Sequence, residues 1–185
     1  MMKYLALLLM ILAAAPAMAA DDAPSLAANH AYLADNAHKP GVMVRPDGLQ
    51  YRILRNGFGS HPAPADTVQI SYSTRLINAK LVDTASPDLP AVLTVSNLLR
   101  GLNEALQLMA AGDRWELVIP SDLALGSKGT PNGGVPPNQT LVFDLTLIAV
   151  IPAQMAQAPD NNGVSIYSRD RGNGHEAGAM FTIHP

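Results

Sequence analysis

The sequence of 185 residues contains no cysteine. Disulfide bonds are therefore excluded, and the packed core alone has to hold the fold together. The same absence argues against lipoprotein attachment behind the apolar run at the N-terminus, because no cysteine lies near that point. A chain of this length can bury enough apolar surface to be stable without such links, as one domain with extensions.

Basic residues are also scarce. The chain has 12 Lys and Arg against 15 Asp and Glu, a formal net charge of -3, with no basic cluster of the kind that marks a nucleic-acid-binding surface. We therefore expect no nucleic-acid partner. Charged residues make up 15% of the sequence and hydrophobic residues 48%, which is the balance of a folded chain and not of a disordered one.

The residue groups that usually carry metal or nucleophile chemistry are missing. The histidines lack the spacing of metal ligands and are expected at the surface: His30, His38, His61, His175 and His184. No Ser-His-Asp set and no pair of carboxylates stands out. The glycine-rich stretch 172–178 lacks the strand-to-helix context of a phosphate-binding loop, so a turn is the better interpretation. We predict neither a metal nor a cofactor.

What the sequence does contain begins with an export signal. Lys3 supplies the positive end, residues 4–15 are apolar, and Ala17-Met18-Ala19 has the small-x-small pattern of a cleavage site. The apolar run is too short to span a bilayer comfortably. A cleaved signal peptide over residues 1–19 is therefore favoured over a retained anchor, with no stable membrane insertion after cleavage.

The centre of the chain predicts a helix followed by a strand. Apolar residues recur at helical spacing at Leu98, Leu102, Ala105, Leu106 and Met109. Thr94 or Ser96 is available to cap the start of this helix, and Gly112 is positioned to end it. In the following stretch, 114–119, Trp115, Leu117 and Ile119 alternate with other residues, which predicts a half-buried strand.

Shorter signals on both sides complete an α+β pattern. Further strands are predicted at 49–55, 68–76, 81–83, 91–95 and 141–148. Residues 20–46 are expected to form a short helical and linker segment, with a helix over 25–37 whose modest apolar face comprises Leu26, Ala27, Tyr32, Leu33 and Ala37. Residues 151–185 form a C-terminal extension with strand-like runs at 164–167 and 180–183, for which a packed hairpin and a frayed tail are equally open.

Several motifs in one order carry a resemblance to a known family. They are 33–37 (LADNA), 47–54 (DGLQYRIL), 66–72 (DTVQISY), 101–109 (GLNEALQLM), 112–124 (GDRWELVIPSDLA) and 135–138 (VPPN). Together they resemble the FKBP-type peptidyl-prolyl cis-trans isomerases, and more narrowly the bacterial branch related to the macrophage infectivity potentiator proteins. The match runs over about residues 31 to 150, and it identifies 47–150 as the isomerase domain.

The resemblance implies a fold and an activity. The fold is an antiparallel sheet curled around one central helix. The activity is the cis/trans isomerisation of X-Pro bonds, which needs a dry apolar pocket that favours the twisted amide, and no acid, base, metal or cofactor. The clients would be proline-containing unfolded or partly folded exported proteins, and the compartment would be the periplasm. Many relatives have a longer dimerising helical segment, but only one helix fits into 20–46, so dimerisation by that route is not expected.

The resemblance also implies ten site positions. Tyr72 and Asp83 would hold each other beside the substrate carbonyl as the catalytic pair. The substrate-binding positions would be Val82, Leu93, Leu98, Leu99, Leu102, Leu125, Val135 and Phe143. The backbone amide at Leu98 and Leu99 could donate to the peptide whatever the side chain. From the residues alone, Tyr72 and the apolar positions would equally be ordinary core.

Four of these positions depart from the family. Val82, Leu93, Leu102 and Leu125 stand where relatives have aromatic residues. Aromatic contacts contribute about 0.5–1.5 kcal/mol each beyond area burial, so we expect weakened isomerase activity. The alternative is a non-catalytic chaperone or peptide-binding module that uses the same apolar groove.

The export signal generates the first testable prediction. The mature protein should begin at Ala20 or within a residue or two of it, because signal peptidases cleave after small-x-small sites. The check is mass spectrometry of the protein extracted from cells. Recovery of a chain that still begins at Met1 would contradict a cleaved signal.

Overall fold

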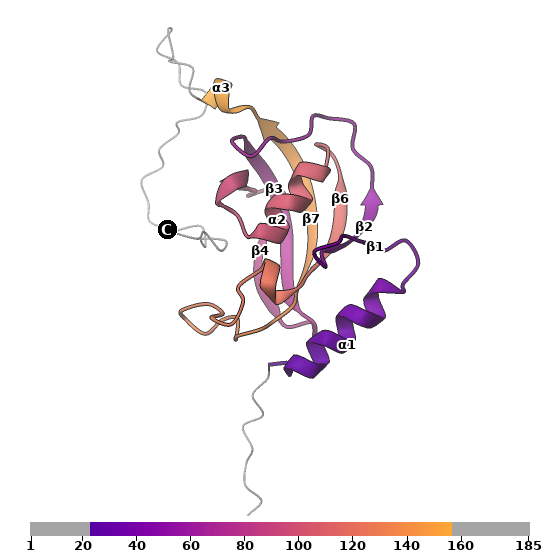
Figure 1. Ribbon diagram of the computed structural model, residues 1–185. Helices are drawn as coiled ribbons and strands as arrows, with labels where there is room; N and C mark the ends of the chain where they lie inside the picture. The colour runs from indigo at the N-terminus through magenta and orange to yellow at the C-terminus, as the bar shows by residue number, and fades with distance from the viewer. Residues whose placement is uncertain (1–22, 157–185) are drawn as a thin grey trace, which may run out of the picture.

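In the computed structural model, an antiparallel sheet of seven strands curls around the helix α2 (Arg100–Leu108) (Figure 1). The structure describes residues 23–156, so the predicted signal segment 1–19 and the runs at 164–167 and 180–183 lie outside the described residues. The strand order is β1-β2-β6-β7-β3-β4, and β5 also pairs with β3. The predicted α+β fold with one central helix against a curled sheet is confirmed.

The six predicted strands are present, with ends that shift by up to three residues. The strands are β1 (Met43–Val44), β2 (Gln50–Arg55), β3 (Thr67–Leu76), β4 (Leu81–Ala85), β5 (Ala91–Thr94), β6 (Arg114–Ile119) and β7 (Leu141–Ile151). The remaining elements are α1 (Leu26–Ala37), α3 (Ala153–Ala156) and the 3-10 turns η1 (Val95–Asn97) and η2 (Ser121–Leu123). The two-residue β1 is an addition to the prediction.

Strand β3 is shared by three neighbours. It pairs with β7 along its whole length, with β5 through its first four residues and with β4 from Tyr72 onward. Every second residue is buried on the inner face, beginning with Val68 and Ile70 and continuing through Tyr72, Thr74 and Leu76. The core therefore lies between this face and α2.

The predicted start and end of the central helix are wrong. Thr94 and Ser96 do not cap α2, because the segment after β5 first forms the 3-10 turn η1, and α2 begins at Arg100 after a Leu99 cap without a side-chain hydrogen bond. The helix ends at Leu108, and Gly112 belongs to the next turn, where its φ is +98°. Leu98 and Met109 are buried as predicted, but both lie outside the helix.

The helix approaches the sheet closely at Gly101. A Cβ atom added there would come within 2.5 Å of Cγ2 of Ile119 on β6. Such a distance is shorter than any real contact between these atoms, so only glycine fits at this crossing. The close contact fixes how deeply the next residue, Leu102, enters the core.

The N-terminal helix α1 is attached to the domain through buried amides, beside which Tyr32, Leu33 and Ala37 of the predicted apolar face are half-buried. Leu26 is 52% exposed, whereas Asn29 and Asn36 are buried. The backbone N–H of Thr140 donates to Oδ1 of Asn29 at 2.8 Å, and Nδ2 of Asn36 donates to Oε1 of Gln50 at 2.8 Å. Ser25 caps the helix by accepting from the N–H of Ala28, so the predicted helix bounds are correct. The predicted apolar face is correct for Tyr32, Leu33 and Ala37 and wrong for the exposed Leu26 and Ala27.

The attachment of α1 generates the second prediction. Asn29→Ala should lower the free energy of unfolding by about 1–3 kcal/mol, because it leaves the N–H of Thr140 buried without an acceptor. The measurement is urea-induced unfolding followed by circular dichroism. His30→Ala, at the exposed neighbouring position on α1, is the control and should change stability by less than about 0.5 kcal/mol. Equal stability of the two variants would contradict the proposed role of the amide.

Candidate functional site

The predicted pair Tyr72 and Asp83 is hydrogen bonded. The Tyr72 hydroxyl on β3 donates to Oδ2 of Asp83 on β4 at 2.8 Å, while Oδ1 of Asp83 accepts from the N–H of Thr84 at 2.8 Å. Tyr72 is only 5% exposed. Burial, followed by the hydrogen bond to Asp83 and its charge, raises the pKa of Tyr72 well above the usual range. The phenol therefore stays protonated at neutral pH, and each of the two carboxylate oxygens of Asp83 accepts one hydrogen bond.

An irregularity in β4 brings two adjacent residues to the same face. Asp83 lies opposite Thr74 and Leu81 lies opposite Arg75, so Val82 is an extra residue in the ladder. In a regular strand neighbouring side chains point to opposite faces. Here Val82 packs against the inner core while Asp83 reaches Tyr72 on the same side. The bulge therefore allows both residues to line one site.

Phe143 and three leucines are four further predicted positions, and all four are buried in the core. Phe143 on β7 is fully buried, with its ring centroid 6.4 Å from that of Tyr72 and the planes tilted by 50°. Leu98 and Leu99 come from the extended link between η1 and α2, and Leu102 comes from the first turn of α2. All three are buried in the same hydrophobic cluster.

The loop from β6 to β7 supplies the last two positions. Leu125 is partly buried against the cluster, and Val135 is buried within it. The N–H of Val135 donates to Oγ1 of Thr130 at 2.8 Å, and the N–H of Thr130 donates to the carbonyl of Val135 at 2.9 Å. This local ring of hydrogen bonds turns Val135 inward. Leu93 on β5, also partly buried, packs on the same cluster.

The ten predicted positions thus lie in the hydrophobic core of the domain or directly beside it. Nine belong to one hydrophobic cluster or pack directly on it, and Asp83 is bonded to one of its members. Most of these side chains are buried, and the rim consists of the partly buried Val82, Leu93 and Leu125. The catalytic and substrate-binding roles of the ten residues stay predictions.

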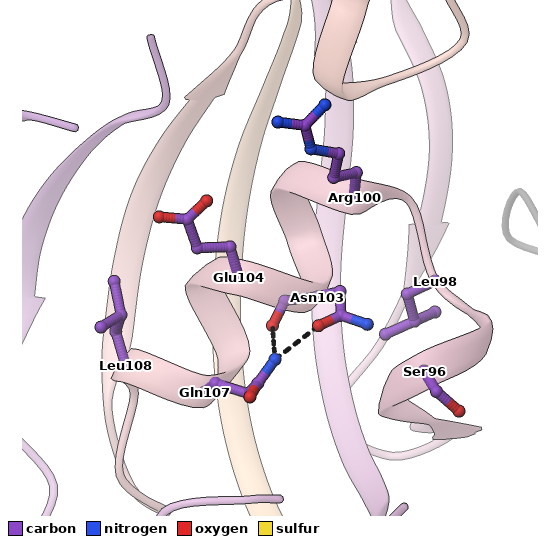
Figure 2. A pocket seen from close by; sticks show the side chains of 7 residues that line it. All are labelled: Ser96, Leu98, Arg100, Asn103, Glu104, Gln107 and Leu108. Carbon is purple, nitrogen blue, oxygen red and sulfur yellow. Dashed lines mark hydrogen bonds between the residues drawn. The ribbon is translucent and has the colours of Figure 1, made fainter. Parts of the chain in front are cut away.

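An open recess among the described residues lies elsewhere on the domain. It has a volume of about 550 Å³ and lies on the outer side of η1 and α2 (Figure 2). Its lining is mostly polar: Ser96, Leu98, Arg100, Asn103, Glu104, Gln107 and Leu108. Nε2 of Gln107 donates to the backbone carbonyl and the side-chain oxygen of Asn103, as Figure 2 shows. Of the predicted positions only Leu98 reaches this recess.

Two kinds of residue near the predicted site carry no functional signal in the sequence. The polar lining of the recess gave no signal, because single polar residues on an exposed helix face are ordinary. Thr74, at the centre of the inner face, was overlooked even though it continues the alternation of Val68, Ile70 and Tyr72. The alternation would have identified it as a buried polar residue.

Within residues 23–156, no group of three or more His, Asp or Glu side chains is arranged to hold a metal ion. In the same described range, none of the helices has the length and apolar character needed to cross a bilayer.

Comparisons with known proteins decide the family. The model described as FKBP-type peptidyl-prolyl cis-trans isomerase matches residues 59–148, and the model for the domain amino-terminal to it matches residues 6–53. A crystal structure of a peptidyl-prolyl cis-trans isomerase from Pseudomonas syringae is 35% identical, with a TM-score of 0.65, and the match covers 71% of this chain and 98% of that one. This chain belongs to the FKBP-type peptidyl-prolyl cis-trans isomerase family.

Curated members of the FKBP-type family are similar over the same region. The outer membrane protein MIP of Legionella longbeachae is 44% identical over 121 residues, or 65% of this chain and 52% of that protein. The FKBP-type 22 kDa peptidyl-prolyl cis-trans isomerase of Escherichia coli is 39% identical over 121 residues, or 65% of this chain and 58% of that protein. This chain therefore spans somewhat more than half the length of these relatives.

The pair of Tyr72 and Asp83 in this FKBP-type domain generates the third prediction. Tyr72→Phe should lower the free energy of unfolding at pH 7 by about 1.5–3 kcal/mol, because a hydrogen bond to a charged group is lost. In a double-mutant cycle with Asp83→Asn, the two changes should couple and not add. Additive effects would contradict the bond.

The raised pKa of Tyr72 gives the pH dependence of this contribution. Below about pH 10, the ordinary pKa of tyrosine, the phenol is protonated in folded and unfolded chains and the contribution is complete. Above it the unfolded chain loses the proton first, so the advantage of the wild type over Tyr72→Phe should shrink as the pH rises. Urea unfolding between pH 7 and pH 11 measures this difference, and a constant difference would contradict the assignment.

Proposed function

We propose that this chain catalyses cis/trans isomerisation of X-Pro bonds in exported proteins, at a lower rate than relatives with an aromatic pocket. The observation that carries the proposal is the Tyr72–Asp83 hydrogen bond beside Phe143, in an apolar cluster to which every other predicted position belongs or against which it packs. Relatives named peptidyl-prolyl cis-trans isomerases support the reaction class.

The chemistry requires little beyond a dry environment. Rotation about a prolyl bond faces a barrier of about 18–20 kcal/mol because the planar amide is stabilised by resonance. Twisting the amide reduces its charge separation, so an apolar surrounding favours the twisted form over the planar one. The buried leucines beneath the rim provide such a surrounding, and the N–H of Leu99 is a backbone donor for the bound peptide.

The reduced rate follows from the aliphatic residues at Val82, Leu93, Leu102 and Leu125. If half of the aromatic contribution acts in the transition state, its loss amounts to about 1–3 kcal/mol, or roughly a factor of five to a few hundred in rate. Leu125 also lacks a hydroxyl that could donate to the peptide.

The compartment and clients are part of the proposal. The N-terminal run with Lys3 and Ala17-Met18-Ala19 supports export to the periplasm. One of the similar proteins is named an outer membrane protein, which is consistent with export of the family branch. The substrates are proline-containing segments of unfolded or partly folded exported proteins.

A second candidate function is a chaperone that holds unfolded segments without isomerising them. Exposed apolar side chains near β4 favour it: Leu81 is 55% exposed and Leu89, in the turn after β4, is 75% exposed. Leu81 is the first residue of the strand that carries Val82 and Asp83, and Leu89 follows the end of that strand, so both are exposed apolar side chains close in sequence to the predicted site.

One pair of assays separates the two candidates. The first follows isomerisation of a short Ala-Pro peptide by exchange NMR without a coupling protease, and the second follows suppression of aggregation of a denatured protein. Acceleration over the uncatalysed rate supports the isomerase. Aggregation suppression without any acceleration would contradict the isomerase and favour the chaperone.

Restoring aromatic residues at the rim is the fourth prediction. Val82→Phe combined with Leu125→Tyr should raise the isomerisation rate about two- to tenfold, because both positions are only partly buried and can accept larger side chains. The control is Leu81→Phe, at an exposed neighbouring position, which should leave the rate unchanged. Leu102→Trp, at a fully buried position, should instead lower the free energy of unfolding by about 1–3 kcal/mol. A well-folded double variant with an unchanged rate would mean that other residues form the pocket.

A further inference from the structure

The hydroxyl of Thr74 is buried without a hydrogen-bond partner. Its side chain is 0% exposed, and Oγ1 has no donor or acceptor in reach among the described residues. An unpaired buried hydroxyl destabilises the folded protein, so native structures keep few of them. A group of this kind is free to act on a molecule that enters the site.

Thr74 lies among the site residues already described. It is directly opposite Asp83 on β4 and directly opposite Phe143 on β7, and it follows Tyr72 by two residues on the same face of β3. Residues opposite each other on neighbouring strands have Cβ atoms about 4.5–5.5 Å apart. The Thr74 side chain therefore forms part of the floor between Asp83 and Phe143.

Thr74 is also the one uncommitted hydroxyl among these side chains. The Tyr72 hydroxyl donates to Asp83, and the Asp83 carboxylate is an acceptor. The remaining eight predicted positions carry only hydrocarbon side chains. Within the described site, Thr74 is thus the side chain that can still donate a hydrogen bond to a substrate.

We propose that the Thr74 hydroxyl donates a hydrogen bond to the prolyl nitrogen of the substrate while its amide is twisted. The inference rests on the proposed isomerase function. In the planar amide the nitrogen lone pair is delocalised into the carbonyl, and twisting returns it to the nitrogen, which then becomes an acceptor. No bond breaks at the hydroxyl, and the proton stays on Thr74.

A contact made only with the twisted amide has a distinct kinetic consequence. An interaction present in the transition state but absent from the bound planar substrate raises kcat and leaves substrate binding unchanged. In the free protein the hydroxyl has no partner to lose, so the contact does not compete with an existing hydrogen bond. Thr74 is therefore assigned to the rotation step and not to peptide affinity.

Access to this floor requires movement of a side chain at the bulge in β4, because Thr74 is fully buried. Val82 is the extra residue of the ladder, and it packs over the same cluster from the rim. Because a bulged residue is left unpaired, its side chain can shift while the neighbouring pairs at Asp83 and Leu81 stay formed. An entering proline ring can then reach the Thr74 side chain without separation of β3 from β4.

The test compares variants that differ by one hydroxyl. Thr74→Val keeps the shape and removes the hydroxyl, and it should lower kcat for an Ala-Pro peptide about tenfold with KM unchanged. Exchange NMR at several peptide concentrations separates kcat from KM. Ser73→Ala, which removes a hydroxyl from the opposite face of β3, is the matched control and should keep the wild-type kcat. Thr74→Ser keeps a hydroxyl and should retain most of the kcat that Thr74→Ala loses. If Thr74→Val folds poorly, the comparison of these two variants tests whether the hydroxyl is needed for kcat.

Stability gives an independent readout. Because the hydroxyl is unpaired in the free protein, Thr74→Val should unfold at the wild-type urea concentration or above it. A clearly lower midpoint would show that the hydroxyl has a partner in the free protein and would overturn the inference. An active wild type with an unchanged kcat in Thr74→Val, or with a raised KM alone, would overturn the inference and leave the isomerase function intact. A wild type without activity would overturn both.

Discussion

The register of strand β3 is the constraint on which the rest of the structure depends. Its ten residues pair with β7, β5 and β4, so three ladders must agree on one alignment. A slip by one residue would turn Tyr72 and Thr74 to the outer face and bring Ser71 and Ser73 inward. The same alternation along β3 places residues in the centre of the core and in the floor of the candidate site. A change of register would therefore alter the core and the site together.

The sequence predicted the strands well because their signal is local. Alternation within six to ten residues determines which face is buried, and β3, β6 and β7 carry it clearly. The helix bounds depended on tertiary context instead. Thr94 and Ser96 are good capping residues by type, but the tight turn of η1 and the contact at Gly101 determine where α2 begins. The amide attachment of α1 was equally hidden, because Asn29 and its partner Thr140 are far apart in the chain.

The site was predictable to the extent that it follows from resemblance. Tyr72 contacts both Asp83 and Phe143, and the aliphatic positions lie in the same hydrophobic core or pack on it, while the roles of all ten stay predictions. The bulge at Val82 could not be foreseen, since one sequence does not reveal which residue of a strand is left unpaired. The alternation of β3 identifies Thr74 as a buried polar residue, but the absence of a hydrogen-bond partner for its hydroxyl is visible only in the structure.

The buried amides of α1 have a consequence for the order of folding. Asn29 contacts Gln139 and Thr140, 110 and 111 residues further along the chain. Such a long loop is closed only after the intervening sheet has formed, because its closure entropy must be offset by contacts that already exist. The contacts of Asn29 therefore form late, whereas the bond between Asn36 and Gln50 on the same helix closes a loop of only 14 residues. A chain that ends before Gln139 would lack both residues to which the Asn29 side chain is hydrogen bonded in the second half of the domain.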